Sequence, residues 1–403
     1  MAHHSSEVPT DAIDRQRTEF GPAPAVAGVR EGAGIVRVPT PFGPSAWLLT
    51  RHQDVRELLA DTESFVNGWR PQDLTDGPER DPRQLSGDRS GNLLSLDPPE
   101  HNRLRRMLTR EFTVRRMRRL EPRVAEIVEQ HLDAMAEHGP PADLVAQYAL
   151  PIPSLVICEL LGVPTADQGE FQERTRRQLD TTLPEQDKAE LGREMLAYMT
   201  GLVERARREP GEDLIGMLIR EHSDELTDAE IIGIANLLLV AGHETTSNML
   251  GLGTLALLRH PDQLAIVRDE PEKVPGAVEE LMRWLSVVNS GSPRMAVRDV
   301  EFGGATIRRG DLVTFDLPAA NRDPGLLDDP ERFDVTRPQS PHLGFGHGIH
   351  HCLGAPLARM EMRIAFPALL RRFPDLRSAV PFEEVAFAST KAIYGLEELP
   401  VTW

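Results

Sequence analysis

The sequence has little cysteine and no long apolar run, and each shortage excludes a class of protein. Only Cys158 and Cys352 occur among 403 residues, which excludes a disulfide-stabilised secreted scaffold and indicates a reducing compartment. No window reaches the ~18 apolar residues that a membrane span needs. The stretch from Met1 to Glu19 has no apolar core of the signal-peptide type. We therefore expect a cytoplasmic protein that does not associate with a membrane.

Basic residues are also scarce. The 45 Lys and Arg residues are outnumbered by 63 Asp and Glu residues, which gives a formal net charge of −18. Such a chain is a poor partner for nucleic acid, because neutralising phosphates requires a basic face. Only three of the basic residues are lysines, at positions 188, 273 and 391, a bias typical of a GC-rich genome.

Apolar residues follow helical spacing over most of the chain up to about residue 290. After Pro122, for instance, they predict a helix that ends at Gly139. A short helix is expected at 52–60, and the polar segment 67–100 is long enough to be a lid or a binding loop. No repeat and no Ser/Gly-rich linker divides the chain. We expect a single domain over residues 1–403.

The β-like segments are short. A Pro/Gly-rich turn at 39–44 predicts a hairpin within 34–50. The other β-like pieces cluster late in the chain, at 296–300, 305–307 and 312–315. The predicted fold class is therefore mainly α with minor β.

The most clearly marked helix begins after Thr227, which can form a capping box with Glu230. No stop signal occurs before His260-Pro261, so the helix would have about 33 residues and a length of roughly 50 Å. Its apolar middle indicates a central, buried position. The segment 241–246, Ala-Gly-His-Glu-Thr-Thr, is poor helix material. It is either a polar groove in this helix or a set of side chains that face solvent or bond back to the preceding turn.

Cys352 precedes a helix with Pro356 in its first turn. Backbone N–H groups at a helix N-terminus favour thiolate, so Cys352 is a candidate ligand or nucleophile. Four glycines near it would allow close approach of a flat or bulky group. Three interpretations compete: a zinc site with the nearby histidines, a Cys–His nucleophile pair, and an axial thiolate to haem iron. The histidines concerned are residues 342, 347, 350 and 351.

Several motifs together resemble those of the cytochrome P450 monooxygenases, in particular the bacterial, actinomycete-type enzymes without a membrane anchor. The segments that match, in family order, are Asp97–Arg106, Ala241–Thr246, Glu280-Leu281-Met282-Arg283, Asp329–Phe333 and Phe345-Gly-x-Gly-x-His-x-Cys-x-Gly354. The resemblance implies a P450-like single domain with a long central helix over a buried haem b.

The resemblance also implies roles for individual residues. Cys352 would be the axial thiolate ligand of the iron, and Thr245 with Glu244 would deliver protons to bound oxygen. The donors to the haem propionates would be His101, Arg105, Arg294 and His350. A structural network beneath the haem would consist of Glu280, Arg283 and Arg332. Cys158, which lies in an apolar helix, is expected to be an inert core residue.

The expected function is insertion of one atom of O₂ into a C–H bond of a bulky, largely apolar small molecule, such as a polyketide or macrolide of secondary metabolism. The candidate substrate contacts are Asn236, Val240, Ala241, Val288, Asn289 and Ile393, each of which could equally be a packing residue. Alternatives within the family are epoxidation, multistep oxidation and coupling. Outside the family they are a non-catalytic haem-binding or sensor protein and a zinc or cysteine hydrolase.

Electrons would come from NAD(P)H through a ferredoxin and its reductase, because the chain has no convincing dinucleotide-binding motif and too few cysteines for an iron–sulfur cluster. Eight arginines occur between residues 103 and 119, opposed by Glu111 alone. They form either an ordinary solvated helix face or a basic docking patch for an acidic ferredoxin. We expect a monomer.

Overall fold

The computed structural model describes residues 13–40, 45–69, 90–178, 183–389, 391 and 393–403. Its α-helices are α1 Pro24–Glu31, α2 His52–Ala60, α3 Glu100–Thr109, α4 Val114–His138, α5 Pro151–Leu161, α6 Gln168–Gln178, α7 Glu185–Arg208, α8 Leu214–His222, α9 Asp228–Arg259, α10 Pro261–Asp269, α11 Val274–Leu285, α12 Leu317–Asn321 and α13 Ala355–Arg372. The predicted mainly α fold is confirmed. The organisation as one domain over residues 1–403 stays a prediction.

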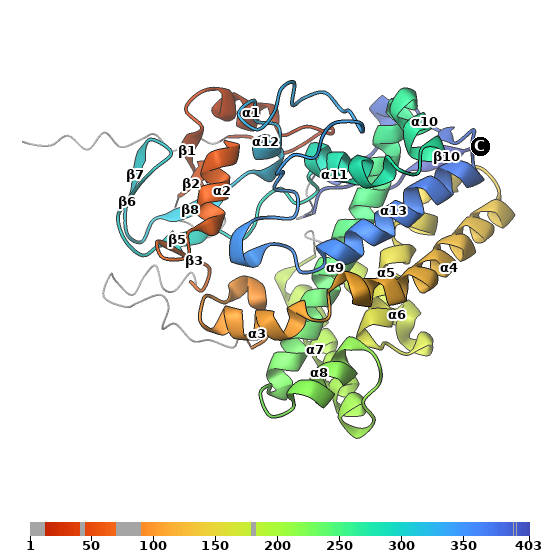
Figure 1. The fold of residues 1–403 in the computed structure, drawn as a ribbon. Helices are drawn as coiled ribbons and strands as arrows, with labels where there is room; N and C mark the ends of the chain where they lie inside the picture. Colours follow the sequence, from red (N-terminus) through yellow and green to blue (C-terminus); the bar gives the residue numbers. More distant parts are fainter. Residues whose placement is uncertain (1–12, 41–44, 70–89, 179–182, 390, 392) are drawn as a thin grey trace, which may run out of the picture.

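The strands are short. They are β1 Ile35–Val38, β2 Ala46–Leu49, β3 Phe65–Val66, β4 Ala142–Asp143, β5 Arg294–Ala296, β6 Val300–Phe302, β7 Ala305–Ile307, β8 Leu312–Phe315, β9 Arg377–Ser378 and β10 Pro400–Thr402. Five of them form a sheet in the order β1-β2-β8-β5-β3, in which only the β2–β8 pairing is parallel. Figure 1 shows this sheet to one side of the helices.

The predicted hairpin is confirmed, with Ile35 paired to Leu49 and Val38 to Ala46; part of its turn, residues 41–44, lies outside the described residues. The prediction of one β-segment over 296–300 is wrong. The chain leaves the five-stranded sheet after Ala296, where Val297 N donates to Ser64 O, and forms the separate β6–β7 hairpin. Two distinct ladders therefore replace one continuous strand.

The helix predicted after Pro122 begins earlier, at Val114, and contains Pro122 in its interior. Proline leaves the carbonyl four residues earlier without its helical partner, and here that residue, Arg118, is exposed to water. The short helix predicted at 52–60 is α2. Most of the predicted lid at 67–100 falls on residues 70–89, outside the described residues.

Helix α9 is the central element of the core. Its 32 residues begin at the capping box that Thr227 and Glu230 form, and they end before Pro261, as predicted. It packs against α5, α7 and α13 and runs through the middle of the helical part in Figure 1. Among the described residues, no helix combines the length and apolarity needed to cross a membrane.

Candidate functional site

One face of α9 is accessible along the middle of the helix, where the other residues are buried. The partly or fully exposed residues between 231 and 249 recur about every four positions, at 232–233, 236–237, 240–242, 244–245 and 248, which places them close to one line along the helix. Ala241 is exposed at its middle. This accessible face contains Asn236, Val240 and the candidate proton-transfer residues.

Helix α9 continues unbroken through the segment 241–246. Thr245 Oγ1 donates to Ala241 O at 2.8 Å. The hydroxyl is thus bonded to the preceding turn of the helix. The sequence left open a polar groove or side chains bonded to the preceding turn, and the second interpretation applies to this hydroxyl. It does so on the accessible face of α9, so the segment is polar as well as helical.

Glu244 is the titratable group on this face. Burial raises the pKa of its carboxyl, while the charge of Lys391 and a hydrogen bond from Asn248 oppose the rise. The C-terminal segment that carries Lys391 packs against α9 so closely at Gly395 that a Cβ there would collide with the Asn248 side chain. Glu244 thus retains its proton to a higher pH than an exposed glutamate does.

Cys352 lies two residues before Gly354, the N-cap of α13. Its N–H donates to Phe345 O at 2.8 Å, and it has exposed surface. Although the residue has exposed surface, the protein atoms around its thiol desolvate it and raise its pKa, and this effect outweighs the lowering by the backbone N–H groups of Gly354 and Ala355. The backbone N–H groups at the helix N-terminus do favour the thiolate, as expected. The net pKa of the thiol is nevertheless raised, because desolvation has the larger effect. A coordinated cation would reverse that balance, because a metal-bound thiol is deprotonated.

Two of the glycines around Cys352 allow close contact with the backbone of neighbouring helices. A Cβ on Gly348, which has φ of +70°, would collide with Leu59 O of α2, and one on Gly344 would lie 2.7 Å from Met282 O of α11. These glycines allow the loop to pass against two helices. The sequence predicted that these glycines would let a flat group approach, but at Gly344 and Gly348 the neighbouring atoms belong to the protein itself.

The four predicted propionate donors lie together. His101 and Arg105 come from α3, Arg294 from β5, and His350 from the loop before Cys352. The rings of His101 and His350 are 4.4 Å apart between centroids. Burial, together with the charges of His101, Arg294 and Arg105, lowers the pKa of His350 to about 3.

This cluster carries more donors than partners. His101 is buried, and its Nε2 has no hydrogen-bond partner. Arg294 is 4% exposed, and burial lowers its pKa to about 10; its guanidinium donates a hydrogen bond to Leu58 O. Arg105 donates to His351 O at 2.6 Å. Arg294 is a buried cation that feels the charges of Asp97 and Asp61 but forms no ion pair within the described residues. A buried charge without such a pair is costly, so the cluster fits a ligand that brings two carboxylates, as haem does.

The zinc interpretation finds no support in the described part of the chain, where no three His, Cys, Asp or Glu side chains gather as metal ligands. His342 is instead held by Glu279, and His350 Nε2 lies 2.6 Å from Asn67 Nδ2. His342 and His350 therefore have separate partners.

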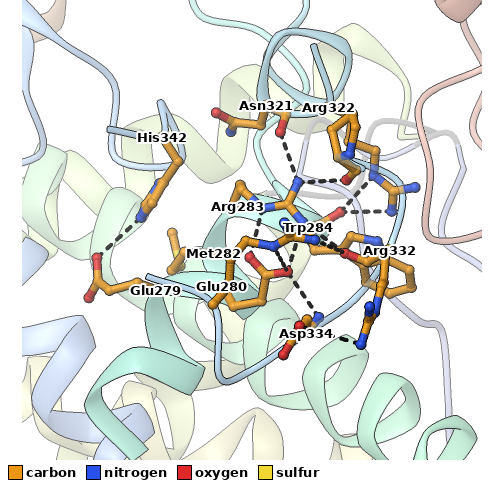
Figure 2. A network of polar contacts seen from close by, with 12 residues as sticks. Glu279, Glu280, Met282, Arg283, Trp284, Asn321, Arg322, Arg332, Asp334 and His342 are labelled. Atoms are coloured by element: carbon orange, nitrogen blue, oxygen red, sulfur yellow. Dashed lines mark hydrogen bonds and ion pairs between the residues drawn. The ribbon is translucent and has the colours of Figure 1, made fainter. Parts of the chain in front are cut away.

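Glu280 and Arg283 form a buried ion pair on α11, with Nε–Oε2 and NH2–Oε1 distances of 2.7 and 2.8 Å. Arg283 is wholly buried and also donates to Asn321 O and Pro330 O. Figure 2 shows this network joining α11 to the segment that follows α12. The structural role of the pair beneath the haem stays a prediction.

The Arg332 side chain does not join this pair. It is 64% exposed and lies 3.6 Å from Asp334, and only its carbonyl accepts from Arg283 (Figure 2). The second arginine beside Glu280 is Arg337, at 3.5 Å, with a side chain 15% exposed. The turn around Asp329, which has φ of +49°, directs Arg332 outward and returns the chain to Glu280 five residues later.

The sequence analysis missed a second ion-pair network beside the first. Glu279 accepts two hydrogen bonds of 2.7 Å from Arg359 of α13 and one from His342. Burial opposes its ionisation, but these partners lower its pKa to about 2. The adjacent Glu279-Glu280 pair at the start of the α11 motif was the available signal.

The candidate substrate wall brings two distant segments together. Val288 pairs with Ile393 as an antiparallel bridge. Asn289 is held by two hydrogen bonds within the protein. Its Oδ1 accepts from the fully buried Arg17 at 3.0 Å, and its carbonyl accepts from Leu317 N. Cys158 is buried in the core, where burial raises its pKa to about 12, in accord with an inert role.

The arginine-rich segment divides into two groups. Arg103 pairs with Glu100 and Glu230, and Arg116 pairs with Glu111. The remaining described arginines outside the propionate cluster are exposed, at positions 106, 110, 118 and 119. They belong to α3, its connection to α4, and α4. This exposed basic face adjoins the Cys352 loop, because α3 contacts that loop through Arg105.

Comparison with known proteins agrees with this geometry. A family model described as cytochrome P450 matches residues 172–374. Cytochrome P450 FAS1 of Rhodococcoides fascians is 46% identical over 97% of this chain and 98% of the relative. Mycinamicin IV hydroxylase/epoxidase of Micromonospora griseorubida is 42% identical over 93% and 94%, respectively. The solved structure of CYP105P1 in complex with filipin I is similar with a TM-score of 0.89 and 40% identity, over 98% of this chain and 99% of that one.

Proposed function

The chain belongs to the cytochrome P450 family, and we propose that it hydroxylates a bulky, largely apolar small molecule of secondary metabolism. It is an oxidoreductase whose cofactor is haem with an axial thiolate. Its relatives include named secondary-metabolite hydroxylases and oxygenases. The proposal concerns which residues do the work and which substrate is oxidised.

The observation that carries the proposal is the position of Cys352 beside a cluster of donors, two of them buried, that form no ion pair with a carboxylate of the described residues. Cys352 would ligate the iron, and the propionates would lie against His101, Arg105, Arg294 and His350. A carboxylate at His101 would satisfy its free Nε2 and favour the charged imidazolium. When bound, haem supplies the iron centre at which O₂ is activated.

Proton delivery is assigned to Glu244 and Thr245. Burial raises the pKa of Glu244, so its carboxyl holds a proton to a higher pH than an exposed glutamate does, and Thr245 Oγ1 is the hydroxyl next to it on the accessible face of α9. To donate a proton into the site, the Thr245 hydroxyl would give up its hydrogen bond to Ala241 O. Lys391, whose charge lowers the pKa of Glu244, also forms an ion pair with Glu397.

The substrate is proposed to lie between the accessible face of α9 and the Val288–Ile393 bridge. Val240 and Ala241 with this bridge provide an apolar surface, and Asn236 is the polar contact. Asn289 contributes through its amide nitrogen, because its oxygen is bonded to Arg17. Relatives that are named for mycinamicin IV or solved with filipin I support a polyketide or macrolide.

Epoxidation is the second candidate reaction. The observation that favours it is the similarity to an enzyme named as both hydroxylase and epoxidase. Both reactions would use the same iron ligand and the same proton donors, so product analysis distinguishes them. Multistep oxidation and coupling stay as further possibilities within the family.

The family uses O₂ and redox partners, and we propose a ferredoxin with its NAD(P)H-dependent reductase for this chain. The exposed basic face next to the Cys352 loop supports an acidic partner, because charge complementarity steers encounter at this side of the molecule. The proposal includes a monomer located in the cytoplasm, with no nucleic-acid or membrane partner.

The test is the absorption spectrum of the reduced protein under carbon monoxide. Wild-type protein should give a Soret band strongly red-shifted from that of histidine-ligated haem, and Cys352→Ser should lose this shift. Cys158→Ser is the matched control and should retain it. Retention of the shifted band in Cys352→Ser would refute the assignment of the ligand.

A further inference from the structure

Arg359 lies where it can act on the thiolate ligand. It is the fifth residue of α13, and its guanidinium lies 4.3 Å from the centroid of the Phe345 ring. On its other side it donates to both oxygens of Glu279, at 2.7 Å each. A bidentate carboxylate and an aromatic face together fix the position of this charge.

Phe345 connects this charge to Cys352. Its carbonyl accepts the Cys352 N–H at 2.8 Å, and its ring also contacts that of His351, 6.4 Å away between centroids. Arg359 is one of two arginines, with Arg105, whose charges act on Cys352. The guanidinium is therefore held beside the ligand loop by contacts to that loop.

Glu279 keeps Arg359 in place and offsets its charge. The Glu279 side chain is 11% exposed and also binds His342 Nε2 at 3.1 Å, a contact drawn in Figure 2. The Arg359 side chain is 27% exposed. Because the pair is largely shielded from water, salt screens its effect on Cys352 less than it screens surface charges.

We propose that Arg359, positioned by Glu279 and Phe345, tunes the electron-donating strength of Cys352 and thereby the reduction potential of the bound haem. A positive charge near the thiolate stabilises its anionic form and the added electron of the ferrous state, so it raises the potential. Glu279 moderates this effect. The inference rests on the proposed ligation of haem by Cys352.

The experiment is an equilibrium redox titration of the haem-bound, substrate-free protein without ferredoxin. Arg359→Gln leaves the Glu279 charge uncompensated and should lower the potential. Glu279→Gln leaves the Arg359 charge uncompensated and should raise it. The double variant carries the same net charge as wild type and should return toward the wild-type potential.

Two controls separate tuning from loss of structure. Arg359→Lys keeps the charge and should stay closer to wild type than Arg359→Gln does. Arg123→Gln, which breaks the ion pair between α4 and α5, should leave the potential unchanged. If Glu279→Gln does not accumulate as haem-bound protein, the Arg359→Gln and Arg359→Lys comparison still decides between charge and packing.

The outcomes separate this inference from the proposed function. Shifts of the same sign in Arg359→Gln and Glu279→Gln, or an unchanged potential in Arg359→Gln, would overturn the inference while the wild-type carbon monoxide band stays normal. Absence of that band in wild type would overturn the proposed ligation, and this inference with it.

Discussion

The two arginines near Glu280 should differ sharply in their contribution to stability. Arg337→Ala removes a side chain that donates to the carbonyls of Asp328, Asp329 and Arg332 at 2.8, 2.9 and 3.1 Å. It also removes a cation 3.5 Å from the buried Glu280 carboxylate. Arg332→Ala removes a mostly exposed side chain with one long ion pair.

The magnitudes follow from these contacts. Hydrogen bonds from a charged donor contribute roughly 1.5–3 kcal/mol. Residues 328, 329 and 332 are exposed, so their carbonyls would bind water in the variant, and about 1 kcal/mol for each bond is appropriate. Arg337→Ala should therefore cost about 3 kcal/mol. Arg332→Ala should cost less than about 1 kcal/mol, as exposed ion pairs do. The difference of about 2 kcal/mol corresponds to roughly a thirtyfold change in the folding equilibrium.

The assay is chemical denaturation of the haem-bound variants, followed by both circular dichroism and the haem band. Arg337→Lys is the matched control: it keeps the charge but loses the forked donor geometry, so its stability should lie between those of wild type and Arg337→Ala. If Arg332→Ala proved as destabilising as Arg337→Ala, the arrangement around Glu280 described here would be refuted.

Three further predictions concern turnover. Thr245→Ala should divert most reducing equivalents to peroxide, whereas Thr245→Ser should retain coupling; equal product per NAD(P)H in Thr245→Ala and wild type would contradict the proton-delivery role. Because Lys391 lowers the pKa of Glu244 and burial raises it, Lys391→Gln should raise that pKa further. The alkaline fall in coupling should then move to higher pH, while Lys273→Gln, at an exposed site on α11's N-terminal side, should leave the pH profile in place. Arg118→Glu should slow reduction by ferredoxin at low ionic strength, with the difference shrinking as salt is added; a salt-independent effect would argue against electrostatic docking.

The sequence predicts the long elements well, because their signals are local. The capping box at Thr227 and the stop at Pro261 bracket α9, and the short β-like segment at 312–315 marks β8. The Cys352 motif is equally local, since it is one loop and the first turn of a helix. In such local features, the spacing of residues along the chain largely determines their arrangement in space.

Other features could not be predicted from the sequence. They depend on the path of the chain through irregular segments, or on contacts between residues that are far apart in the sequence. Arg332 matches a motif by spacing, but the turn at Asp329 decides that Arg337 reaches Glu280. The Glu279–Arg359 pair joins two helices whose relative position no local pattern specifies. The pKa of Cys352 depends on burial by the whole fold, which outweighs the helix N-terminus that the sequence reveals.

The single parallel pairing of the sheet has a consequence for biosynthesis. β2 is buried throughout, yet one of its two neighbours, β8, begins only at residue 312. At about 5–20 residues per second of translation, the nascent chain spends tens of seconds with this apolar edge unpaired. An unpaired strand edge is a site for aggregation or chaperone binding. A chain that stops before residue 312 would leave the ribosome with that edge uncovered, so most of the translated length must be complete before the hairpin finds its permanent neighbour.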